Sequence, residues 1–131
     1  MDDIQPFIYN ATLDRVIDGD TVKLKTVDLG FNVQIHDRSV RIINIDTPES
    51  RINIKKYPER AREKEMGLEA KALLKDWLTI TKTLKIRSYG TDKYGRILAD
   101  VFCDQGNVAE LLIEKGLACH YDGGTKTKVW E

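Results

Sequence analysis

The chain has 131 residues, of which 41% are hydrophobic and 32% are charged, a balance typical of a globular protein and not of a disordered or fibrous one. Its 21 basic and 21 acidic side chains cancel, so the total charge does not by itself indicate a nucleic-acid partner. No apolar stretch approaches the roughly 20 residues of a membrane-spanning helix, and no signal-peptide pattern is present. We expect a single domain over residues 1–131, with no membrane partner, in the cytoplasm. If a signal was removed from the chain, a secreted or periplasmic location is the alternative.

The first 45 residues have the pattern of β-strands. Residues 7–17 form a first run, and residues 21–27 alternate apolar with polar side chains, as in a strand with one buried face. Residues 29–31 (Leu-Gly-Phe) indicate a turn or bulge before a third, bent stretch over residues 33–45. The polar residues 37–39 predict an interruption within that third stretch.

A long helix is predicted after this strand region. Pro48 ends the strands, residues 51–57 form a polar loop, and Pro58 suits the first turn of a helix. Between residues 61 and 78 the apolar side chains fall on one helical stripe that favours a core-facing helix. The members of this stripe are Met66, Ala70, Leu73, Leu74, Trp77 and Leu78.

The second half of the chain predicts a hairpin and a short helix. Residues 83–89 and 97–103 are the strands of the hairpin, and residues 90–96 carry its turn chemistry. Asn107 suits the N-cap of the helix and Gly116 its C-cap, with a brief extended segment at residues 117–121 and a turn at residues 122–124.

The predicted order is therefore three strands, a helix, two strands and a helix. Short strands in a small domain protect their edges by curling into a barrel. We expect a β-rich α+β fold with two or three helices, built on a five-stranded Greek-key barrel of the oligonucleotide/oligosaccharide-binding (OB) type.

Two acidic clusters each follow an apolar, β-branched run: residues 18–21 (Asp-Gly-Asp-Thr) and residues 46–49 (Asp-Thr-Pro-Glu). If the two strands are neighbours, their carboxylates converge, and hard oxygen ligands of this kind suit Ca²⁺ or Mg²⁺. Arg41 precedes the second cluster, and Arg96 ends the turn at residues 92–96. Together these groups describe a site for a phosphate ester. Each cluster taken alone is also an ordinary turn, and Asp18, in an Asp-Gly pair, is expected to be structural.

Other charged and metal-binding residue types give weaker signals. The basic residues within 51–64 either form a groove for nucleic acid or belong to a solvated loop and helix start. Cys103 and Cys119 match no zinc or redox spacing and are expected to be free thiols. His36 and His120 are isolated in the sequence, which disfavours a zinc site.

Four segments carry a resemblance to a known family: residues 15–24 (RVIDGDTVKL), 41–49 (RIINIDTPE), 92–96 (DKYGR) and 107–118. In this order and at this spacing, they resemble the staphylococcal (micrococcal) nuclease, or thermonuclease-like, family. The resemblance extends over roughly residues 11–121. It implies a thermonuclease-like domain with the OB-type barrel.

The resemblance also implies roles for individual residues. The ligands of a Ca²⁺ cofactor would be two carboxylates and one backbone carbonyl, from Asp20, Asp46 and Thr47. The catalytic residues would be Arg41, Glu49 and Arg96. The residues in contact with the phosphate or sugar of the nucleotide would be Lys93, Tyr94 and Tyr121.

The function implied is a Ca²⁺-dependent phosphodiesterase that hydrolyses DNA, RNA or both with little sequence preference. Water would attack phosphorus and the 5′-oxygen would leave, so the products would carry 3′-phosphates. Single-stranded substrate is favoured because it needs the least unstacking. The alternative is a nucleic-acid-binding module of the same fold with weak or no catalysis. We favour the enzyme because every catalytic position is present, and we expect a monomer that requires no protein partner.

Overall fold

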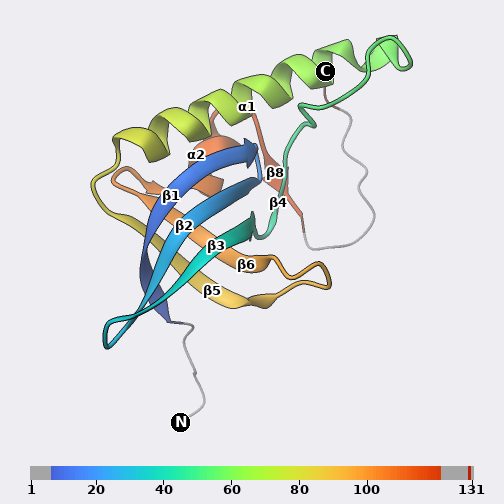
Figure 1. Ribbon diagram of the computed structural model, residues 1–131. Helices are drawn as coiled ribbons and strands as arrows, with labels where there is room; N and C mark the ends of the chain where they lie inside the picture. Colours follow the sequence, from blue (N-terminus) through green and yellow to red (C-terminus); the bar gives the residue numbers. More distant parts are fainter. Residues whose placement is uncertain (1–6, 122–129, 131) are drawn as a thin grey trace.

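The strands of the chain curl into a closed barrel, and a long helix, α1 (Ala61–Ile80), lies across one end of it (Figure 1). The structure is a computed structural model, and it describes residues 7–121 and 130. Five strands form the barrel wall: β1 (Ile8–Asp18), β2 (Thr21–Gly30), β3 (Val33–Ile42), β5 (Leu84–Thr91) and β6 (Ile97–Cys103). The predicted OB-type α+β fold is confirmed.

Strand pairing follows the order β3-β2-β1-β5-β6, and a further pairing joins the two ends of this series. The four pairings within the series are antiparallel, whereas β3 and β6 run parallel where they close the barrel. Three shorter strands extend the framework. β7 (Gly106–Asn107) pairs with β6, and β4 (Ile45–Asp46) pairs with β8 (Cys119–His120) in a separate small sheet.

The core fills the barrel and the space beneath α1. Its fully buried strand residues include Val22, Leu24, Val40, Ile42 and Val101. Met66, Ala70, Leu74, Trp77 and Leu78 on α1 are buried as the helical stripe predicted, while Leu73 is only partly buried. Fully burying one large aliphatic side chain contributes about 1.5–3 kcal/mol, so this stripe fixes α1 on the barrel.

The third strand differs from the sequence prediction. We expected an interruption at residues 37–39, but β3 passes through them in unbroken register, with Thr26 opposite His36 and Leu24 opposite Arg38. Asp37 has a φ of 57°, a left-handed conformation that aspartate tolerates better than most residues. The chain turns instead at Asn44, where φ is 65°, between β3 and β4.

The predicted helix ends are confirmed. The short 3₁₀ helix η1 (Pro58–Arg60) leads into α1, and Asn107 caps α2 (Val108–Glu114) by accepting a bond from the Ala109 N–H at 2.9 Å. Gly116, with a φ of 75°, ends that region. Its N–H donates to Ile113, and the next N–H donates to Leu112, in the pattern of a Schellman motif.

Three remaining expectations concern single features. Cys103 and Cys119 are both free thiols, as predicted. No helix in the described part of the chain is long and apolar enough to cross a bilayer. The turn predicted at residues 122–124 lies outside the described residues.

Asp104 joins the end of β6 to the start of β5. Its carboxylate accepts bonds from the Lys82 N–H at 2.9 Å and from the Thr83 N–H and hydroxyl at 3.2 and 2.9 Å. These bonds, that of the Lys82 N–H foremost, lower the pKa of Asp104 to about 2. They stabilise the ionised carboxylate in the folded state only.

We expect Asp104→Asn to lower the free energy of unfolding at neutral pH. An aspartate that ionises near pH 2 when folded, and near the ordinary value of about 3.9 when unfolded, stabilises the fold above pH 4. That contribution is lost as the pH falls toward 2. Urea unfolding of both proteins between pH 6 and pH 2 should show their difference shrinking below pH 4. A difference that stays constant would contradict the role of the charge.

Candidate active site

A polar cavity of about 720 Å³ collects all three residues predicted to be catalytic. Arg41, Glu49 and Arg96 all line it, together with Asp20 and Thr47. They come from the β1–β2 turn, from β3, from the loop after β4 and from the end of the β5–β6 turn. The remaining lining residues are Ile17, Asp18, Thr21, Ser39 and Arg51. Segments far apart in the sequence therefore meet at one place.

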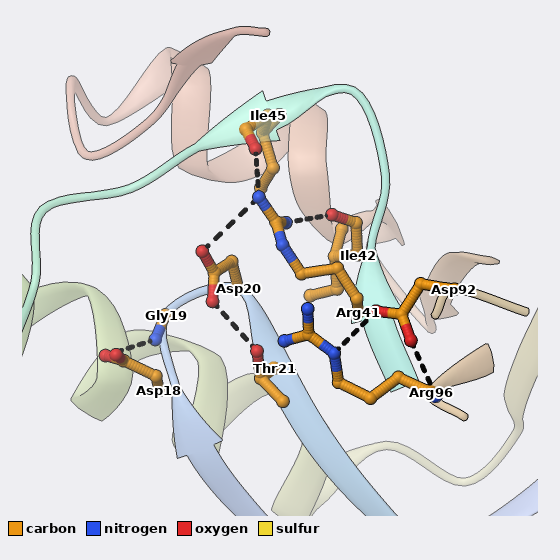
Figure 2. A network of polar contacts seen from close by, with 9 residues as sticks. All are labelled: Asp18, Gly19, Asp20, Thr21, Arg41, Ile42, Ile45, Asp92 and Arg96. Carbon is orange, nitrogen blue, oxygen red and sulfur yellow. Dashed lines mark hydrogen bonds and ion pairs between the residues drawn. The ribbon is translucent and has the colours of Figure 1, made fainter. Parts of the chain in front are cut away.

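Arg41 is held between two neighbouring strands. It lies opposite Thr21 on β2 and Leu98 on β6. Its guanidinium donates to the carbonyls of Ile42 and Ile45, the latter at 2.8 Å, and one amino nitrogen lies 3.5 Å from Asp20 Oδ2 (Figure 2). The side chain is only 15% exposed. These contacts fix the Arg41 side chain in place. Because a guanidinium has five N–H donors, some of them remain available to a ligand.

The three predicted metal ligands come from the β1–β2 turn, from β4 and from the loop that follows β4. Asp20 accepts a bond from the Thr21 hydroxyl at 2.9 Å and is 17% exposed on the cavity wall. Asp46 is buried on β4, opposite Cys119 of β8, and Thr47 follows it into the cavity lining. Asp46 itself is not among the lining residues.

The donor set fits a hard cation. Among the described residues, no cluster of three or more His, Cys, Asp and Glu side chains could hold a metal ion. The predicted set contains only two carboxylates, and its third ligand is the backbone carbonyl of Thr47. Ca²⁺ accepts carboxylates, backbone carbonyls and water in six- to eightfold coordination, so this all-oxygen set is compatible with it.

Arg96 is oriented by Asp92, a residue to which the sequence analysis gave no role. The Arg96 Nε donates to Asp92 Oδ2 at 2.7 Å, and the backbone N–H groups of Tyr94 and Arg96 both donate to Oδ1 at 2.9 Å. Desolvation raises the pKa of Asp92, but the hydrogen bonds from Arg96 and Tyr94 outweigh it and leave that pKa below its ordinary value. Asp92 therefore stays ionised beside the guanidinium (Figure 2). The sequence signal that could have indicated this role is an aspartate at the start of a tight turn, where its side chain commonly accepts bonds from the turn backbone.

The three residues predicted to bind substrate are not among those that line the cavity. Lys93 and Tyr94 lie on the β5–β6 turn, where the Lys93 Nζ is 5.2 Å and the Arg96 Cζ is 5.6 Å from the centre of the Tyr94 ring. Tyr94 is 73% exposed. Tyr121 follows β8, and its N–H donates to the Asn44 carbonyl at 2.8 Å, at the turn between β3 and β4.

The loop that carries Glu49 packs directly on the backbone of α1. A Cβ atom at Gly67 would lie 2.5 Å from the Glu49 carbonyl and 2.6 Å from the Ser50 nitrogen, so only glycine permits this approach. The Ser50 hydroxyl donates to Asp18 Oδ1 at 2.8 Å, and the Gly19 N–H donates to the same oxygen at 2.9 Å. Asp18 thus joins this loop to the β1–β2 turn, in line with the structural role expected for it.

Comparison with known proteins identifies the family to which the chain belongs. The family model for staphylococcal nuclease homologues matches residues 39–129, which include Arg41, Glu49 and Arg96. The chain belongs to the staphylococcal nuclease family. This confirms the resemblance drawn from the sequence motifs.

Several curated relatives support this membership. Endonuclease YncB of Bacillus subtilis is 35% identical over 117 residues, which cover 87% of this chain and 49% of the relative. The SPbeta prophage-derived endonuclease YokF of the same organism is 36% identical over 114 residues (85% of this chain, 34% of the relative). Endonuclease YhcR, also from B. subtilis, is 33% identical over 116 residues (86% and 9%). This chain therefore spans less than half the length of these relatives.

We expect Gly67→Ala to destabilise the fold. In the interior of an ordinary helix this change gains up to about 1 kcal/mol of helix propensity. Here the new methyl group would meet the Glu49 and Ser50 backbone at 2.5–2.6 Å, and overpacking of this kind costs about 1–3 kcal/mol. Urea unfolding should show a net loss of stability, while Glu69→Ala on the exposed face of α1 should change little. A gain in stability for Gly67→Ala would show that the loop carrying Glu49 can move away from α1 at little cost.

Proposed function

We propose that the chain is a metal-dependent nuclease that hydrolyses the phosphodiester bonds of DNA, RNA or both with little sequence preference. The observation that carries this proposal is the single cavity lined by Arg41, Glu49 and Arg96 together with Asp20 and Thr47. Relatives that bear the name endonuclease support the same class of reaction.

We propose Ca²⁺ as the cofactor, held by the carboxylates of Asp20 and Asp46 and the backbone carbonyl of Thr47. Bound there, the ion would polarise a non-bridging oxygen of the phosphate. The support for Ca²⁺ is the chemistry of the donors, since two carboxylates and a carbonyl supply only oxygen.

The chain's own residues account for the remaining chemistry. Arg41 and Arg96 present planar guanidinium groups that match the non-bridging oxygens of a phosphate and stabilise the charge that grows there in the transition state. Glu49, whose side chain is 60% exposed, is accessible to water and takes a proton from the attacking molecule. A bond forms between the water oxygen and phosphorus, and the bond from phosphorus to the 5′-oxygen breaks. The product keeps a 3′-phosphate.

Substrate binding is proposed to favour single strands. The Tyr94 ring is 73% exposed, with the cations Lys93 and Arg96 within 5.6 Å of its centre, and we propose that a base stacks on it. Such stacking contributes about 1–3 kcal/mol per base without sequence preference. Tyr121 is proposed to contact the phosphate or sugar of the same nucleotide. We propose that the chain does this as a monomer.

The first test is cleavage of a single-stranded oligonucleotide in Ca²⁺ and in EGTA. We expect cleavage in Ca²⁺ only, and losses of about 10²–10³ in rate for Arg41→Ala, Glu49→Gln and Arg96→Ala, because each removes a group that acts on the reacting phosphate. Melting curves should stay close to that of the wild type. If the protein binds DNA but cleaves nothing with Ca²⁺, Mg²⁺ or Mn²⁺, it is a binding module of the same fold.

Arg51 provides a second test of nucleic-acid binding. It is exposed and lines the cavity, whereas Arg62 is paired with Glu65 at 3.1 Å and is not among the lining residues. In EGTA, we expect Arg51→Ala to weaken single-stranded DNA binding and to reduce the slope of log K against log salt by about 0.7, the value of one phosphate contact. Arg62→Ala removes the same charge and should have little effect. Equal effects would show that only total charge matters.

A further inference from the structure

Glu49 has a network of contacts with the first turns of the helical region. Its backbone N–H donates to Glu63 Oε2 at 3.2 Å, and its carboxylate lies 3.7 Å from an amino nitrogen of Arg60. Arg60 in turn donates from Nε and Nη2 to the Glu63 carboxylate at 3.1–3.2 Å. Glu63 therefore contacts the backbone of Glu49, and Arg60 contacts its side chain.

The burial of these groups shows which of them is fixed. The Glu63 side chain is 15% exposed, Arg60 is 38% exposed and Glu49 is 60% exposed. A bidentate arginine–carboxylate pair is among the more rigid polar contacts in proteins. Glu63 and Arg60 thus form the bidentate, less exposed part of the network, and the more exposed carboxylate of Glu49 lies 3.7 Å from Arg60.

We infer that Glu63 and Arg60 are positioning residues for Glu49, an inference that rests on the proposed nuclease function. Glu63 fixes the loop backbone beside Gly67, and Arg60 restricts the Glu49 carboxylate to orientations at the cavity wall. Neither residue lines the cavity, so neither touches the substrate there. Their effect on catalysis passes through Glu49.

This inference predicts a particular pattern in the kinetics. Misplacing a catalytic group by about 1 Å can cost a hundredfold in rate, so we expect Glu63→Ala to lower kcat by between about tenfold and a hundredfold. KM and the binding of single-stranded DNA in EGTA should stay close to wild type. Glu63→Gln, which keeps an oxygen for the Glu49 N–H but loses the charge that Arg60 requires, should have an intermediate effect and is less prone to disturb the fold.

The chain offers a closely matched control. Arg62 and Glu65 form an ion pair at 3.1 Å with the same spacing of three residues, on the exposed side of α1. Glu65→Ala removes the same kind of side chain from the same helical region without touching the Glu49 loop. We expect wild-type kcat for this variant.

The decisive experiment is a double-mutant cycle of Glu63→Ala with Glu49→Gln, measured by single-turnover cleavage of an oligonucleotide in Ca²⁺. If Glu63 acts through Glu49, the double variant should be no slower than Glu49→Gln alone. Fully additive losses, or a Glu63→Ala variant with the kcat of Glu65→Ala, would overturn the inference while the nuclease function stands. A wild-type protein that cleaves nothing would instead overturn the proposed function and this inference with it.

Discussion

The parallel pairing of β3 with β6 is the constraint on which the candidate active site depends. It sets Arg41 opposite Leu98, two residues beyond Arg96, while the antiparallel pairing with β2 sets Arg41 opposite Thr21, the neighbour of Asp20. Arg41 therefore lies between the two segments that supply a second arginine and a carboxylate. Because side chains alternate between the faces of a strand, a slip of one residue would turn Arg41 to the other face of the sheet.

α1 contributes to the site through its packing as much as through its own side chains. Its apolar stripe fixes it on the barrel, and Gly67 on the same buried face admits the Glu49 loop to backbone contact. Glu63, four residues before Gly67, and Arg60, seven residues before it, also contact Glu49. The barrel thus positions the two arginines and Asp20, and the helix positions the carboxylate proposed to act as the base.

Local sequence signals predicted the elements well, and the family resemblance pointed to Arg41, Glu49 and Arg96, which the fold brings to one cavity. Some patterns involve only a few neighbouring residues and can be recognised from the sequence without the fold. They are the alternation at residues 21–27, the N-cap at Asn107 and the C-terminal glycine Gly116. The interruption predicted at residues 37–39 was wrong. Asp37 is a residue type typical of turns, but the pairing of β3 with β2 continues the strand through this position. The contacts of Gly67 and Glu63 with the Glu49 loop arise only when α1 packs on the barrel. No local sequence pattern predicts these contacts.

The most direct test of this arrangement is a crystal structure with Ca²⁺ and a non-hydrolysable oligonucleotide. We expect the metal between the carboxylates of Asp20 and Asp46, and one phosphate within hydrogen-bond reach of both Arg41 and Arg96. A phosphate bound away from these two arginines, or a metal coordinated by neither aspartate, would contradict the site proposed for this chain.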